Sequence, residues 1–116
     1  MVNTSYTLKG NNIEQPVRDF IKNHHQKGHE SNYTGGFLWI YEDYSWLNNN
    51  YLMVCIRVDT TKVQNGILTI EVISGGAAEG IFRKLTFGSD KRRVTRFGKE
   101  LQEFCEEQKI ELEVSD

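Results

Sequence analysis

Two segments of the chain space their apolar residues as an amphipathic α-helix does. Ile13–Gln26 carries the shorter apolar stripe, and Asn12 is placed to cap it. Asp90–Gln108 carries the longer stripe, and Ser89 or Asp90 is placed to cap it. The stripe residues are Ile13, Val17, Phe20, Ile21, Val94, Phe97, Leu101, Phe104 and Cys105. The pattern predicts two helices that each bury one face.

Strands are indicated by runs that alternate or are rich in β-branched and aromatic residues. These runs are Ser5–Lys9, Phe37–Trp46, Tyr51–Thr60, Gly66–Ser74 and Lys109–Val114. The pair Asn65 and Gly66 suits a tight hairpin between two of the runs, because both residue types tolerate a positive φ. The order β-α-β-β-β-α-β predicts a single α+β domain over residues 1–116, a two-layer sandwich of a mainly antiparallel sheet and two helices.

The middle strands predict two different sheet faces. One face carries only apolar residues, so we expect the helices to cover it: Leu52, Val54, Ile56, Val58, Leu68, Ile70 and Val72. The opposite face mixes apolar with polar residues: Met53, Cys55, Arg57, Asp59, Ile67, Thr69, Glu71 and Ile73. Trp39 and Tyr41 share one face of their strand, and the pattern allows this to be the half-apolar one. A half-apolar face is typical of a subunit interface or a ligand cleft, which predicts a homodimer.

Composition narrows the range of partners. The 116 residues carry a formal net charge of −2, which does not favour non-specific binding to nucleic acid or to a membrane surface. No apolar run reaches the roughly 20 residues of a membrane span, and the first residues lack the features of a signal peptide. Cys55 and Cys105 lie on apolar patterns, so we expect reduced and buried thiols. These features predict a cytoplasmic protein without a membrane or nucleic-acid partner.

Charge is unevenly distributed along the chain, and this predicts a binding site. Residues 91–99 are basic, and they follow a diglycine at a strand end. If a helix begins near Ser89, its free amide groups and the nearby guanidinium groups would together hold a phosphate or a carboxylate. The predicted ligand-binding residues are Ser74, Gly75, Gly76, Ser89, Arg92, Arg93 and Arg96, with Trp39 and Tyr41 as an apolar wall. The alternatives are a sharp corner at the glycines and a solvated basic face.

Other chemistries have less support in the sequence. The glycines match neither a P-loop nor a dinucleotide-binding fingerprint, and no cofactor is expected. His24, His25 and His29 lack the ligand pattern of a zinc site, and no metal is expected. Glu71 or Asp59 could serve acid–base catalysis in a hydrolase or isomerase, but a cross-strand ion pair explains Glu71 better.

Three short stretches resemble a family of small, uncharacterised bacterial proteins. Ser74-Gly75-Gly76 ends a strand, Phe87-Gly88-Ser89-Asp90 precedes the C-terminal helix, and Tyr6–Gly10 is similar to the family's opening strand. The resemblance implies a bacterial, cytosolic origin and no catalytic activity. We therefore expect a non-enzymatic binding module with an anion site. The alternative is an interaction and homodimerisation module without a ligand, and a hydrolase or isomerase is less favoured.

Overall fold

The computed structural model describes the backbone of residues 2–45, 50–76 and 83–115, and the side chains of residues 3–42, 53–75 and 96–115. The strands are β1 (Val2–Lys9), β2 (His29–Tyr33), β3 (Gly36–Ser45), β4 (Asn50–Asp59), β5 (Ile67–Gly76) and β6 (Glu111–Ser115). The α-helices are α1 (Glu14–His24) and α2 (Arg83–Gln108), and a short 3-10 helix, η1, spans Val63–Asn65.

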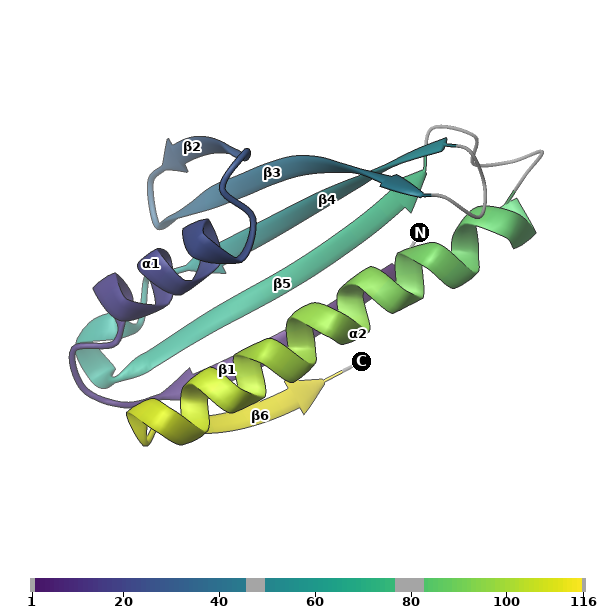
Figure 1. The fold of residues 1–116 in the computed structure, drawn as a ribbon. Coiled ribbons are helices and arrows are strands. Elements are labelled where there is room, and N and C mark those ends of the chain that lie inside the picture. Colours follow the sequence, from purple (N-terminus) through teal and green to yellow (C-terminus); the bar gives the residue numbers. More distant parts are fainter. Residues whose placement is uncertain (1, 46–49, 77–82, 116) are drawn as a thin grey trace.

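The six strands join in one antiparallel sheet, in the order β2-β3-β4-β5-β1-β6. Figure 1 shows α1 and α2 on the same side of this sheet, with α2 lying along β1 and β5. The predicted fold class, a two-layer α+β sandwich with a mainly antiparallel sheet, is confirmed. The observed order of elements contains one strand more than the sequence predicts, because β2 precedes β3.

The core lies between the sheet and the two helices. Alternate residues of four strands point into it and are almost completely buried: Tyr6, Leu8, Phe37, Trp39, Tyr41, Val54, Ile56, Val58, Leu68, Ile70 and Val72. The helices add Val17, Ile21, Phe97, Leu101 and Cys105. Each large apolar side chain buried in this way contributes about 1.5–3 kcal/mol to stability. The helix-covered face predicted for β4 and β5 is therefore confirmed for its described residues.

Trp39 and Tyr41 lie in this core and not on the half-apolar face, which the sequence pattern leaves open for them. In the β3–β4 register Trp39 is opposite Ile56, and Tyr41 is opposite Val54. Residues directly opposite one another in an antiparallel pair project to the same side of the sheet. The exposed fractions are 7% for Trp39 and 4% for Tyr41, so neither ring is free to form the wall of an open pocket.

The sequence pattern does not predict β2, because His29–Tyr33 has no apolar alternation. The segment becomes a strand by pairing with β3 across the turn at Thr34 and Gly35. Gly35 has a φ of 100°, a conformation that glycine adopts easily and other residues do not. The pairing with β3, and not a local preference, decides the conformation of this segment.

Two predicted turn features are also wrong. Asn12 does not cap α1: it has a φ of 56°, and Ile13 occupies the N-cap position without a side-chain hydrogen bond. The Asn65–Gly66 pair does not form a two-residue hairpin, because Asn65 ends η1 and only Gly66 of the pair has a positive φ, 75°. This longer connection lets the carbonyl of Gly66 accept a hydrogen bond from the Gly10 amide at 2.9 Å.

α2 begins at Arg83, so the predicted start at Ser89 or Asp90 is wrong. Gly88 directly precedes Ser89, and a glycine inside a helix lowers its stability by about 1 kcal/mol relative to alanine. For this reason the sequence around Gly88 resembles a helix end. α2 nevertheless continues through it and runs along the sheet in Figure 1. Most helix stability in proteins comes from packing of an amphipathic face, which outweighs a local signal of this size.

Gly98 allows α2 to lie close to β1, and this contact is testable. A methyl group added at Gly98 would lie 2.5 Å from the hydroxyl oxygen of Tyr6, a residue with a 3% exposed fraction. We expect Gly98→Ala to lower the free energy of unfolding by about 1 kcal/mol, because an overpacking cost of about 2 kcal/mol exceeds the helix-propensity gain of about 1 kcal/mol. Chemical denaturation measures the change, and the same substitution should cost less in a Tyr6→Phe background, where the clashing hydroxyl is absent. Unchanged or higher stability of Gly98→Ala would contradict the close contact.

Candidate functional site

The structure brings together two residues of the predicted anion site. Ser74 and Tyr41 lie on the helix-covered face, on either side of Val54 in the sheet register. Ser74 is completely buried, and its hydroxyl has no hydrogen-bond partner in the described part of the chain. Gly75 and Gly76 follow it at the end of β5. A buried hydroxyl without a partner is unusual, and it marks this end of the sheet as a candidate binding site.

The basic part of the predicted site is only partly described. Arg96 is exposed, and its Nε atom lies 3.5 Å from Oε1 of Glu100. The side chains of Ser89, Arg92 and Arg93 lie outside the described residues. Because α2 begins well before Ser89, the amide groups here lie inside the helix and bond to carbonyls one turn earlier. The free amide groups on which the prediction relied are therefore not at Ser89.

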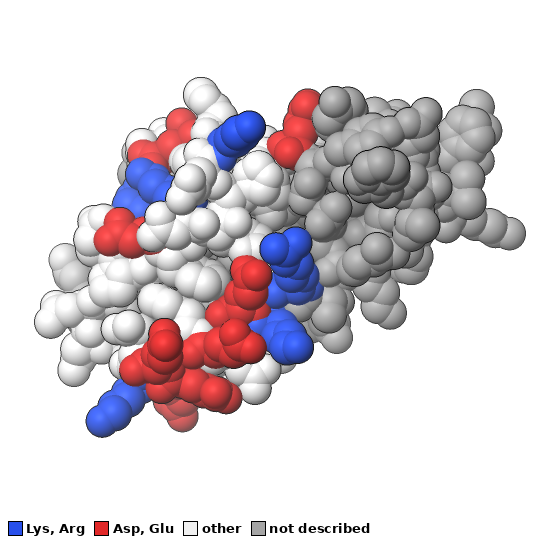
Figure 2. Space-filling view, in the orientation of Figure 1, with Lys and Arg blue, Asp and Glu red and all other residues white. Residues whose placement is uncertain are grey.

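A hollow of about 350 Å³ lies between α1 and α2, and we call it the α1–α2 hollow. It is lined by Phe20, Asn23, His24, Glu100, Glu103, Phe104 and Glu107. Aromatic rings form its floor, since Phe20 of α1 stacks on Phe104 of α2 with ring centroids 4.7 Å apart. Figure 2 shows carboxylates gathered over the C-terminal half of α2.

One polar contact joins the two helices at this hollow. The side chain of His24 is only 8% exposed, and its Nδ1 atom contacts Oε2 of Glu100. The His24 ring also packs edge-on against Phe97, with centroids 5.1 Å apart. Glu100 therefore has both His24 and Arg96 as partners, whereas the two other carboxylates of the hollow have no ion-pair partner among the residues that the structure describes.

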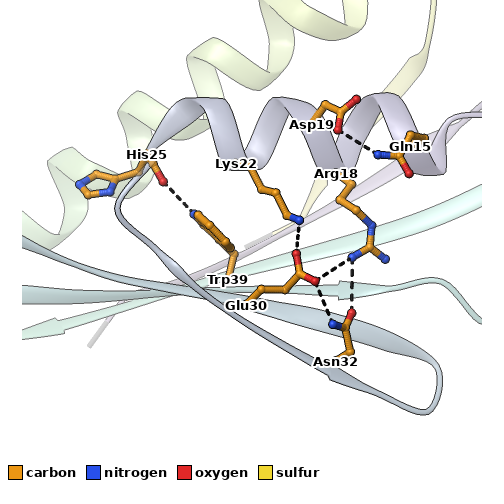
Figure 3. Close-up of polar contacts among 8 residues, drawn as sticks. All are labelled: Gln15, Arg18, Asp19, Lys22, His25, Glu30, Asn32 and Trp39. Atoms are coloured by element: carbon orange, nitrogen blue, oxygen red, sulfur yellow. Dashed lines mark hydrogen bonds and ion pairs between the residues drawn. The ribbon is translucent and has the colours of Figure 1, made fainter.

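α1 is held against the sheet by a polar cluster on the β2–β3 hairpin, which Figure 3 shows. Lys22 and Arg18 of α1 both form ion pairs with Glu30 of β2, and the Arg18 pair measures 3.7 Å. The indole N–H of Trp39 donates a hydrogen bond to the backbone carbonyl of His25 at 3.0 Å. The pKa of Glu30 is lowered, chiefly by the hydrogen bond from Lys22. The cluster fixes the end of α1 that carries His24.

The three histidines lie in different surroundings. His25 stacks on the Tyr41 ring with centroids 4.0 Å apart, and its Nδ1 atom is buried without a hydrogen-bond partner among the described residues. His29 is exposed on β2, opposite Ile40. The described part of the chain contains no group of three or more histidine, cysteine, aspartate or glutamate residues that could hold a metal ion.

The sheet face opposite the helices, which we call the open face, is the second candidate surface. Ile40, Cys55 and Ile73 are neighbours on this face, across β3, β4 and β5. Met53 lies beside them on β4 and is 52% exposed. Within the described ranges no helix or strand lies over these side chains (Figure 1). The half-apolar face that the sequence predicts is therefore present, but without Trp39 and Tyr41.

The two carboxylates considered for catalysis lie on the open face and have partners. Nε of Arg57 lies 3.1 Å from Oε1 of Glu71, which is the cross-strand pair that the sequence favours. Asp59 accepts hydrogen bonds from the amide and the hydroxyl of Thr61, at 2.9 and 2.6 Å. These bonds lower the pKa of Asp59, which opposes a proton-transfer role near neutral pH. The geometry does not favour acid–base catalysis by either residue.

The α1–α2 hollow has only a weak signal in the sequence. Glu100, Glu103 and Glu107 have the spacing that places side chains on one side of a helix, and the sequence pattern assigns all three, together with Glu106, to solvent. His24 lies at the edge of the apolar stripe of α1. Nothing in the pattern shows that the two helices meet at these residues.

No family model matches the chain, and neither a curated protein nor a solved structure matches it. The likeness to small bacterial proteins therefore stays a prediction. In the described part of the chain, no helix has the length and apolar character that crossing a membrane requires. The function has to be argued from the two surfaces themselves.

The Glu30 cluster should make stability depend on pH. We expect Glu30→Gln to lower the free energy of unfolding at neutral pH by about 1 kcal/mol, because the Glu30 side chain is 26% exposed and solvent weakens its ion pairs. The folded pKa lies below the unfolded one, so this stability is present above the unfolded pKa and is lost as the pH falls through the folded pKa.

Thermal melts of the wild type and Glu30→Gln should therefore converge as the pH falls below 4.5, the ordinary value for a glutamate. Glu106→Gln, which removes an exposed carboxylate of α2, is the matched control and should show no such convergence. A Glu30→Gln difference that stays constant through the acidic range would contradict this role of the cluster.

Proposed function

We propose that this protein is a non-enzymatic binding protein that works as a homodimer, with the open face as the interface. The proposal is carried by the apolar row of Ile40, Cys55 and Ile73, with Met53 beside it, on a face that the described elements leave uncovered. Removing such side chains from water contributes about 25 cal/mol per Å² of apolar surface. The cytoplasmic location stays a prediction.

The size of the open face supports a stable interface. A patch that is four strands wide, with about 4.8 Å per strand, and eight residues long, with about 3.3 Å per residue, has an area on the order of 500 Å² when it is treated as flat. A specific interface buries about 800 Å² of accessible surface per partner. Because side chains protrude from the sheet, the accessible area of this patch is larger than its flat area. The face and its rim are therefore of the size that a dimer needs.

The charges on the open face favour a second copy as the occupant. In a two-fold interface the same patch lies on both subunits, so the patch must complement itself. Arg57 and Glu71 form a neutral pair next to the apolar row, and a two-fold axis can place Arg57 of one copy near Glu71 of the other. This pairing leaves neither Arg57 nor Glu71 as an unpaired charge within the interface.

A charge placed on the open face should break the dimer. We expect the wild type to sediment as a dimer and Met53→Lys to sediment as a monomer, because the ammonium group would be desolvated at the interface. Gln64→Lys makes the same charge change at an exposed position of η1 and should remain a dimer. Analytical ultracentrifugation at several concentrations measures both.

Alkylation of Cys55 provides a second measurement of the same interface. A second copy on the open face would cover the Cys55 thiol, so alkylation should be faster in Met53→Lys than in the wild type. The raised pKa of this thiol, caused by burial and by Glu71, slows the reaction in both proteins. A wild type that is a monomer at every concentration would overturn the dimer.

Anion binding beneath α2 is a second candidate function, and Ser74 favours it. A buried hydroxyl without a partner costs about 1–3 kcal/mol, and an oxygen of a bound phosphate or carboxylate would satisfy it. In this proposal Arg92 and Arg93 supply the positive charge. Tyr41, which lies in the core, no longer serves as an open wall of the site.

Phosphate or sulfate should raise the melting temperature of the wild type if this site exists. Ser74→Ala should lose the gain without lowering the melting temperature in anion-free buffer, because it removes a buried hydroxyl that has no hydrogen-bond partner among the described residues. Arg92→Ala with Arg93→Ala should also abolish the gain, whereas Lys27→Ala with Lys62→Ala, two exposed cations elsewhere, should keep it. No anion-dependent shift in the wild type would remove this function.

A further inference from the structure

The α1–α2 hollow has the features of a docking site for a basic side chain. We infer that it receives a lysine or arginine side chain from a protein partner. The hollow lies on the helix side of the molecule, so this inference is independent of the homodimer proposed through the open face. It goes beyond the anion site as well, because it concerns a ligand of the opposite charge.

The floor of the hollow suits the stem of a long side chain. Phe20 and Phe104 are half-buried, so their rings present apolar surface between the helices. Lysine and arginine lay their methylene groups along such surface and keep the charged head in water. Aromatic faces also attract the cationic head. The protein makes this contact elsewhere, since the guanidinium carbon of Arg18 lies 4.0 Å from the ring centroid of Phe37.

The rim of the hollow supplies the complementary charge. Glu103 and Glu107 line it and have no ion-pair partner in the part of the chain that the structure describes. Their spacing of four residues places two like charges next to each other on the helix, which costs a few tenths of a kcal/mol. A cation between them removes this repulsion. α1 also ends at His24, and the last carbonyl groups of a helix carry partial negative charge.

A basic side chain fits the hollow better than a metal ion does. The volume of about 350 Å³ is much larger than an ion needs, and the floor is aromatic. The described residues also contain no cluster of three ligands for a metal. A protein segment adds backbone and neighbouring side chains that can rest on the exposed surfaces of α1 and α2.

The test is an NMR titration of the ¹⁵N-labelled full chain with an alternating lysine–glycine peptide. We expect saturable shifts at the amides around Asn23, His24 and Phe104, and none with the matching glutamate–glycine peptide. Glu103→Gln with Glu107→Gln should weaken binding roughly tenfold, because two exposed ion pairs are lost. Both residues are exposed, so the fold should remain intact in this variant.

The matched control removes two carboxylates outside the hollow. Glu106→Gln with Glu111→Gln changes the net charge equally and should bind the peptide as the wild type does. Equal weakening in the two double variants would mean long-range attraction and would overturn the site. Absence of saturable shifts in the wild type would do the same. If n-butylammonium alone bound as tightly at the same amides, the occupant would be a small amine, and the protein partner would be overturned.

Discussion

α2 packs on one face of the sheet through Phe97, Leu101 and Cys105, and this one-sided packing determines where the other features lie. The sheet has two faces, and both described α-helices cover the same one. Where the helices meet above the core, their side chains enclose the α1–α2 hollow. The opposite face keeps apolar side chains without a described helix over them. Both candidate surfaces therefore follow from the same packing.

The apolar periods of the sequence predict most of this arrangement. Val54, Ile56 and Val58 alternate with less buried residues, so the strand and its covered side are both visible in the sequence. The segment of β2 carries no apolar side, and its pairing with β3 is what makes it a strand. The predicted start of α2 is wrong for a related reason, because the energetic cost of Gly88 inside a helix is small compared with the stability that a long helix gains from packing.

The candidate sites depend on contacts that a single segment does not contain. Alternation shows that Trp39 and Tyr41 share a face, but only the register with β4 shows that this face is the covered one. In the same way, the spacing of Glu103 and Glu107 places them together on α2, but α1 turns that face into a hollow. The predicted anion site relied on a helix start, and a helix start is set by tertiary packing when local signals are weak.

The hollow and the open face lie on opposite layers of the sandwich, so a dimer formed through the open face leaves both hollows accessible. A dimer joined through its open faces carries one hollow on each outer surface. A partner with several basic residues can then engage both hollows, and the second contact forms at a high effective concentration if the spacing between the sites is matched. A partner with one basic residue gains nothing from the dimer. If both proposals hold, self-association strengthens the binding of a partner with several basic residues, while each hollow still receives a single basic side chain on its own.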